Sequence, residues 1–212
     1  MSQPGLLITF EGTEGGGKTT QIALLAERFR TLGRGVRVLR EPGGTAVGEE
    51  IRHTLKHSEA NRAMTAEAEL LLMNASRAQL VREVIRPALA AGEIVLCDRF
   101  YDSPTAYQGY GRGLDLRQIT ALTDFVVGGT RPDLTLLLAV PLAVSEARRL
   151  GRQAVLRDRF EEAERAFFER VERGYEAIAA AEPGRVKVVD GTQSVTTVAG
   201  AVWDCVKRLL ED

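Results

Sequence analysis

The feature that most constrains the fold is a glycine-rich segment between a short apolar run and an amphipathic stretch. Residues 12–19 read Gly-Thr-Glu-Gly-Gly-Gly-Lys-Thr and match the pattern G-x-x-x-x-G-K-[ST]. They follow the apolar run 6–10 and open a stretch with helical spacing at 19–32. Glycines let backbone N–H groups converge on phosphate oxygens, and the next helix points its positive end at the same anion. The pattern therefore predicts a strand–loop–helix unit that binds the phosphates of a nucleoside triphosphate.

Individual residues around this loop have separate expected tasks. Lys18 is expected to reach the β- and γ-phosphates, and the Thr19 hydroxyl to ligate Mg²⁺. Asp98 follows the apolar run 94–97 and is placed to hold Mg²⁺ or its water shell, while Arg99 is a fork donor suited to phosphate oxygens. The alternative for this pair is an ion pair that caps the sheet. The residues predicted to bind ATP are Gly12, Thr13, Glu14, Gly15, Gly16, Gly17, Lys18, Thr19 and Thr20, and the predicted metal ligands are Thr19 and Asp98.

Short apolar runs alternate with helical patterns along the rest of the chain. Strands are predicted at 6–10, 36–39, 94–97, 134–140 and 186–189, helices at 19–32, 45–56, 66–90, 115–127, 160–182 and 194–210, and a glycine-rich loop at 108–113. Buried strands that alternate with helices predict an α/β fold: a doubly wound, five-stranded parallel sheet with helices on both faces. Ligands of such sheets lie beyond the carboxyl ends of the strands. With no repeat or low-complexity linker, one domain over residues 1–212 is expected.

Composition excludes several classes of protein. The formal net charge is −1, which argues against a surface that binds nucleic acid over the whole molecule. Two cysteines, Cys97 and Cys205, each in an apolar stretch, make no disulfide framework or metal signature, so each is predicted to be a buried free thiol. Neither a secretory signal nor an apolar run long enough to span a membrane is present, so no membrane partner and a cytoplasmic location are expected.

The predicted helix 66–90 carries an arginine inside its apolar face. That face is formed by Leu70, Met73, Leu80, Val81 and Val84, with Arg77 in its middle. An unpaired buried guanidinium is costly, so Arg77 needs a partner, either an internal acid or the phosphate or base of a ligand. Arg52, on the helix after Glu41-Pro42, is a second candidate for an acceptor phosphate, with a solvated surface position as the alternative.

Five arginines crowd the segment around Gly151. They are Arg148, Arg149, Arg152, Arg157 and Arg159. A cluster of like charge is commonly a solvated face. The alternative is a lid at about 148–159 that closes to supply a cation to the phosphoryl group, because the loop 12–19 contains no arginine.

Taken together, the motifs resemble those of bacterial thymidylate kinases, members of the P-loop nucleoside monophosphate kinases. The resemblance covers nearly the whole chain. It rests on Phe10-Glu11-Gly12 with the loop, Arg40-Glu41-Pro42-Gly43-Gly44, residues 48–52, Ala75-Ser76-Arg77, Asp98-Arg99-Phe100, residues 106–109, 111–113 and 131–135, and Asp158-Arg159-Phe160-Glu161. It implies transfer of the γ-phosphoryl group of ATP to dTMP, giving ADP and dTDP for dTTP synthesis, with Mg²⁺ as cofactor. It also implies a homodimer whose contact lies near the helix 66–90.

The resemblance further implies a role for each matching residue. Glu14 would contact the sugar 3′-hydroxyl, and Glu41 and Pro42 would line the acceptor pocket. Arg52 and Arg99 would hold the acceptor phosphate, and Arg77 would hydrogen-bond the thymine edge. The implied acceptor set is Glu14, Glu41, Pro42, Arg52, Met73, Arg77, Arg99, Ser103, Tyr107 and Gln108, and the implied catalytic set is Lys18, Asp98, Arg99 and the lid residues Arg152 and Arg157.

Three positions depart from the family pattern. Met73 stands where a phenylalanine often stacks on thymine, although a thioether can also pack on a ring. Pro104 stands where relatives commonly have a small polar residue, and Ala139 where they often have an acid or amide. Three other functions are possible: another nucleotide kinase of this fold, a GTP-dependent switch, which the absence of an Asn-Lys-x-Asp motif disfavours, and a nucleic-acid-dependent ATPase.

Overall fold

The computed structural model describes residues 4–150 and 165–211. Arg152, Arg157 and Arg159 of the predicted lid lie outside the described residues, as does the start of the helix predicted at 160–182. Every other predicted site residue lies within them.

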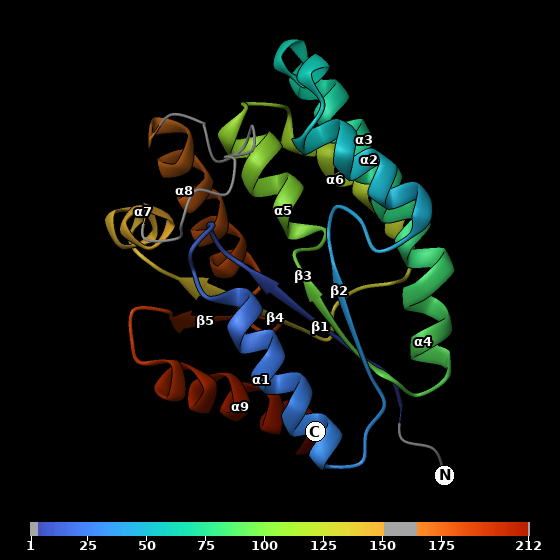
Figure 1. The fold of residues 1–212 in the computed structure, drawn as a ribbon, viewed down its shortest axis with the longest axis vertical. Coiled ribbons are helices and arrows are strands. Elements are labelled where there is room, and N and C mark those ends of the chain that lie inside the picture. Colours follow the sequence, from blue (N-terminus) through green and yellow to red (C-terminus); the bar gives the residue numbers. More distant parts are fainter. Residues whose placement is uncertain (1–3, 151–164, 212) are drawn as a thin grey trace.

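A five-stranded sheet forms the centre of the molecule (Figure 1). Its strands are β1 (Leu6–Glu11), β2 (Val36–Arg40), β3 (Ile94–Asp98), β4 (Leu134–Ala139) and β5 (Val186–Asp190). All pairings are parallel and the order is β2-β3-β1-β4-β5. Because β1 lies between β3 and β4, the chain reverses its direction of winding here, so the predicted doubly wound fold is confirmed. Phe10 pairs with Asp98, which places that acid beside the start of the glycine-rich loop.

Helices connect the strands and cover both faces of the sheet. They are α1 (Lys18–Thr31), α2 (Ala46–Lys56), η1 (Glu59–Ala63), α3 (Ala66–Leu80), η2 (Val81–Ile85), α4 (Arg86–Ala90), α5 (Asp102–Pro104), η3 (Thr105–Gly111), α6 (Leu116–Val127), α7 (Leu142–Leu150), α8 (Arg165–Ala181) and α9 (Val195–Glu211). Polar caps begin several of them: Thr65 accepts a hydrogen bond from the Ala68 N–H at α3, and Asp115 accepts one from the Arg117 N–H at α6.

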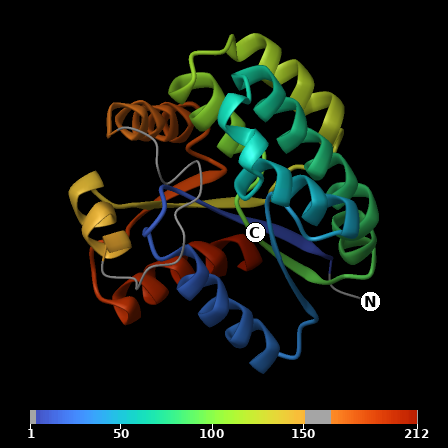
Figure 2. The same ribbon diagram turned by 45° about the horizontal axis from the view of Figure 1, so that its top comes forward.

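The core lies in layers on either side of the sheet. Helices α1 and α9 pack side by side on one face, where Phe29 and Val202 meet the strand side chains (Figures 1 and 2). On the other face, Leu80 and Ile85 of the α3–α4 segment pack with Val127 of α6. A third apolar cluster joins α8 to η3 beside β4. The carboxyl ends of the strands are left to face the loops that form the site.

Two predicted elements differ from the structure. The loop expected at 108–113 is wrong over most of its length, because η3 is a π-type helix that runs through Gly111. Its glycines allow close packing rather than a turn: a Cβ at Gly111 would lie 2.6 Å from the Phe167 ring. The helix expected at 66–90 is interrupted by the π-type segment η2.

Candidate active site

The glycine-rich loop connects β1 to α1 and depends on backbone conformations that favour glycine. Gly12, Gly15 and Gly17 have φ of 125°, 81° and 92°. The space is also limited, since a Cβ at Gly15 would lie 2.9 Å from the Ser145 carbonyl oxygen. The loop therefore presents its backbone at the N-terminus of α1, as an anion-binding loop requires.

Lys18 is buried inside this loop. Its Nζ donates to the carbonyl oxygens of Gly12 and Thr13, both at 3.0 Å, and the Gly16 N–H donates to Thr13 at 3.3 Å. Burial lowers the pKa of Lys18 to about 8, with the nearby Arg99 acting in the same direction. The ammonium group thus lies under the loop, close to where phosphate oxygens would bind.

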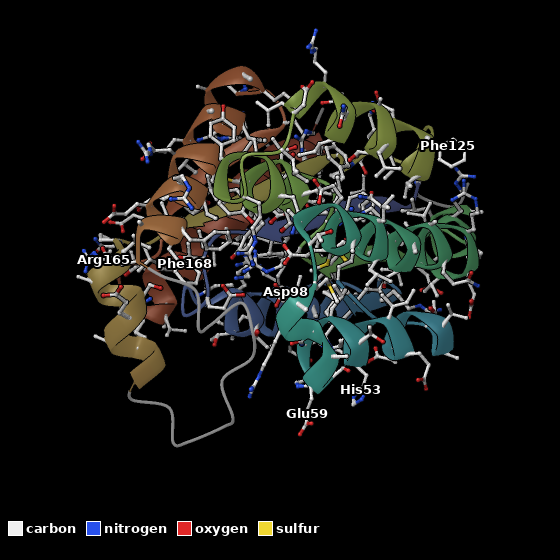
Figure 3. All side chains as sticks on the ribbon, turned by 90° about the horizontal axis from the view of Figure 1, so that it is seen from above. His53, Glu59, Asp98, Phe125, Arg165 and Phe168 are labelled. Carbon is white, nitrogen blue, oxygen red and sulfur yellow. The ribbon has the colours of Figure 1, made fainter. Side chains whose placement is uncertain are left out.

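Thr19 and Asp98 bring a hydroxyl and a carboxylate close together next to the loop. The Thr19 hydroxyl lies 3.4 Å from Oδ2 of Asp98, and Figure 3 shows Asp98 near the middle of the molecule, far from peripheral residues such as Phe125 and Arg165. In the described part of the chain, no cluster of three or more His, Cys, Asp or Glu side chains could hold a metal by itself. A hydroxyl and one carboxylate suit a hard divalent cation that completes its shell with phosphate oxygens and water.

Two adjoining pockets open above the sheet. The first, the acceptor pocket, is lined by Glu14, Glu41, Pro42, Lys56, Met73, Arg77, Arg99, Ser103, Pro104, Tyr107 and Gln108. The second, the phosphate pocket, has a volume of about 160 Å³ and is lined by Glu14, Gly15, Gly17, Lys18, Thr19, Thr20, Arg40, Glu41, Arg52, Lys56, Asp98 and Arg99. Four residues line both: Glu14, Glu41, Lys56 and Arg99. Two ligands bound in these pockets would meet at those residues.

Arg99 lies at this junction and is held by several side chains. Its backbone is in the left-handed region, with φ of 67°, directly after β3. Its guanidinium donates to Glu14 at 2.9 Å and to the hydroxyls of Tyr107 and Tyr175 at 2.9 Å each. Burial alone would raise the pKa of Glu14, but the attraction of Arg99 and Lys18 outweighs it and lowers that pKa to about 2.

Glu11 fixes the segment that carries Arg99. This fully buried carboxylate accepts hydrogen bonds from the Phe100 N–H at 2.8 Å, from the Ser103 hydroxyl at 2.7 Å and from the Tyr175 hydroxyl at 2.7 Å. Burial raises the pKa of Glu11. Sequence reasoning assigned no role to Glu11 or Tyr175. An acid at the end of an apolar strand was the available signal for Glu11.

Arg77 has an internal partner and also lines the acceptor pocket. The side chain is 2% exposed, and its Nε donates to Glu41 at 2.8 Å. Further bonds run from Nη1 to Asn74, and from Nη2 to Glu41 and to the Phe100 carbonyl oxygen. Burial outweighs the attraction of Arg77 and raises the pKa of Glu41 to about 7. Of the five guanidinium N–H groups, four have partners among the described residues, which leaves one on Nη1 for a ligand.

The remaining predicted residues divide between the two pockets. Arg52 lines the phosphate pocket and donates to the Pro42 carbonyl oxygen at 2.9 Å, so it is not an outlying surface arginine. Sequence reasoning missed Arg40 and Lys56, which line the same pocket. Of the five clustered arginines, Arg148 has a described side chain, and it donates to the carbonyl oxygens of Gly191 at 3.0 Å and Gly15 at 3.4 Å.

Comparisons with known proteins agree with this geometry. The family model described as thymidylate kinase matches residues 10–202. A thymidylate kinase of Desulforudis audaxviator (strain MP104C) is 48% identical over 210 residues, covering 98% of this chain and 93% of that protein. One of Synechococcus sp. (strain JA-3-3Ab) is 50% identical over 207 residues, covering 97% of each.

A solved structure supports the same assignment. The crystal structure of thymidylate kinase from Ehrlichia chaffeensis superposes with a TM-score of 0.79 at 32% identity, covering 96% of this chain and 99% of that one. No helix in residues 4–150 or 165–211 is both long and apolar enough to cross a membrane. The fold, the loop and the paired pockets, together with full-length similarity, show that this chain belongs to the thymidylate kinase family.

Proposed function

We propose that this protein transfers the γ-phosphoryl group of ATP to dTMP, giving ADP and dTDP for DNA precursor synthesis. The observation that carries the proposal is the meeting of the two pockets at Arg99 and Glu14. One pocket adjoins the glycine loop, while the other has an apolar wall and polar groups suited to a base and sugar. Phosphoryl transfer requires donor and acceptor phosphates to lie in line, and pockets that adjoin in this way would hold them so.

On this proposal the phosphate pocket neutralises charge on the moving group. Lys18 would approach the β- and γ-phosphates, and Thr19 and Asp98 would hold Mg²⁺, which would supply neutralisation of the phosphate charge. Arg52 and Arg99 bind the acceptor phosphate, and their presence in the phosphate pocket supports this role. A further cation would come from Arg152 or Arg157, which lie outside the described residues.

The acceptor pocket would recognise the nucleoside. Arg77 has one N–H left to donate to the thymine O4, and Met73 would pack against the ring, with Pro42 and Ser103 on the pocket wall. Glu14 would accept a hydrogen bond from the sugar 3′-hydroxyl, since its lowered pKa keeps it ionised at neutral pH. Tyr107 and Gln108 would border the base and sugar.

A panel of acceptors tests this function. ADP release is measured by a coupled assay with ATP, Mg²⁺ and each of dTMP, dUMP, dCMP, AMP and GMP. We expect dTMP above dUMP, because a methyl group is worth only about 1–3 kcal/mol in a pocket, and both well above dCMP. Equal use of dCMP would contradict the thymidylate assignment, and ATP turnover that needs DNA rather than a nucleotide would contradict the kinase assignment.

We also propose that the protein is a homodimer that works in the cytoplasm. Leu71 of α3 and Phe125 of α6 are 57% and 79% exposed, and burying such side chains in a subunit contact would be favourable. Both cysteines are free, as suits a reducing compartment, although Cys205 is only half-buried and the prediction of a buried thiol holds for Cys97 alone. Sedimentation equilibrium tests the dimer, and Phe125→Glu should shift it toward the monomer.

A further inference from the structure

Behind the acceptor pocket, a buried acid contacts one of the pocket's polar side chains. Glu69, in the first turn of α3, is fully buried. It accepts a hydrogen bond from Nε2 of Gln108 at 2.7 Å, and Gln108 lines the acceptor pocket from η3. A bond between these elements reaches across 39 residues of sequence and places a carboxylate directly behind a pocket amide.

This contact determines which way the Gln108 amide faces. An ionised carboxylate can only accept hydrogen bonds, so the NH₂ end of the amide must face Glu69 and the carbonyl end must face away. Within the described residues, Oε1 of Gln108 has no hydrogen-bond partner. Gln108 therefore presents a hydrogen-bond acceptor, its carbonyl oxygen, to the pocket rather than a donor.

The carboxylate is itself held in place by its surroundings. Arg112 donates to it from Nη2 at 3.2 Å, and the same guanidinium lies over the Phe167 ring, 4.5 Å from the centroid. The N-terminal turn of a helix also favours a negative charge. Because its ion pair and its helix position both hold Glu69, the carboxylate has little freedom to release the Gln108 amide.

We propose that Glu69 is a positioning residue for base selection, a proposal that rests on the function proposed above. By fixing the Gln108 carbonyl toward the pocket, Glu69 favours bases with an N–H at ring position 3, namely thymine and uracil. Cytosine presents an acceptor at that position, so its lone pair would face the Gln108 carbonyl oxygen. Pro104 also lines the pocket but has neither a polar side chain nor an N–H, so it offers the base no competing hydrogen bond from either.

The test is Glu69→Gln, which keeps the shape of the side chain but no longer requires the NH₂ group of Gln108 to face residue 69. The introduced amide can donate as well as accept, so the Gln108 amide can then adopt either orientation. We expect KM for dTMP to rise by only about twofold, because the orientation that binds thymine stays populated, and kcat and KM for ATP to stay within about twofold. The ratio of kcat/KM for dTMP to that for dCMP should fall by ~10-fold.

A matched control is available on the same helical segment. The exposed pair Gln79 and Glu83 has the same kind of bond, Nε2 to Oε2 at 2.7 Å, away from both pockets. Glu83→Gln should leave every kinetic constant unchanged. Thermal unfolding of both variants separates a change in base selection from a general loss of stability.

A double mutant shows whether Glu69 acts through Gln108. In a Gln108→Ala background, Glu69→Gln should change the dTMP-to-dCMP ratio by less than about twofold, because the two effects are not independent. An unchanged ratio in the single variant, or an equal fall in both backgrounds, would overturn the inference while leaving the kinase intact. A wild-type enzyme that uses dCMP as readily as dTMP would overturn the proposed function and this inference with it.

Discussion

Replacing Glu14 with glutamine should lower the free energy of unfolding at neutral pH and have little effect in strong acid. Burial alone would raise the pKa of Glu14, but Arg99, Lys18 and the hydrogen bond from Tyr107 lower it from 4.5 to about 2. A carboxyl group whose pKa is lower in the folded chain adds stability above its unfolded pKa. That contribution is lost as the pH falls from 4.5 through 2.

The magnitude follows from this shift. A change from 4.5 to about 2 corresponds to ~3 kcal/mol at pH 7, at ~1.4 kcal/mol per unit. The Glu14 side chain is 21% exposed, so screening by solvent brings the expected loss in Glu14→Gln to about 2–3 kcal/mol. By the same linkage, about 1 kcal/mol of the contribution remains at pH 3 and less than about 0.5 kcal/mol at pH 2.

Urea unfolding at pH 7, 4 and 3 measures this directly. The free energy of unfolding of Glu14→Gln should approach that of the wild type as the pH falls, without a change in the slope against urea. Glu50→Gln, which removes an exposed acid from α2, should show no such convergence. A difference between wild type and Glu14→Gln that is the same at pH 7 and pH 3 would refute the attribution to the Glu14 charge.

Three further substitutions test separate parts of the site. Lys18→Ala should lower kcat by at least ~10²–10³-fold, the cost of losing one preorganised charge-stabilising donor, and near-normal turnover in a folded variant would contradict its role. Asp98→Asn should raise the Mg²⁺ concentration for half-maximal activity by ~10-fold or more, measured by titrating turnover with the metal, and an unchanged curve would remove Asp98 as a ligand. Met73→Ala should reduce the preference for dTMP over dUMP by ~10-fold in kcat/KM if the side chain packs on the thymine methyl, while an unchanged ratio would place the methyl elsewhere.

Much of the fold follows from local pattern. Each strand is a short apolar run that ends near a polar or glycine-rich turn, and the five predicted strands are all present within a residue or two of their expected ends. The loop 12–19 was predictable because its glycines and Lys18 have one well-defined use between a strand and a helix. Segment η3 was not predictable, because Gly111 lies in a helix that packs closely against Phe167 of α8, a residue far away along the chain.

The residues of the site were predictable only where a single residue type at its position already indicates a function. Arg77 could be singled out as a charge on an apolar face, but the sequence could not decide between an internal acid and a ligand as its partner. The structure shows an acid, Glu41, which is 36 residues away. The anchoring of Glu11 by Tyr175 spans 164 residues and depends on how α8 packs against η3. No spacing of residues along the sequence predicts a contact between such distant residues.

The rule that identified Arg77 also applies to acids, and this shows where sequence reasoning could be extended. At 100° per residue, Glu69 lies near the edge of the apolar face that contains Met73 and Arg77, so it too is a charge that must find a partner. Its partners, Gln108 and Arg112, come from a segment predicted as a loop, where no fixed hydrogen-bond donor to Glu69 was expected. A charged residue on a buried face thus predicts that a complementary side chain exists, while the fold decides which one. In this chain Gln108, which pairs with Glu69, also lines the acceptor pocket. The need to pair a buried carboxylate therefore also fixes the amide that we propose selects the base.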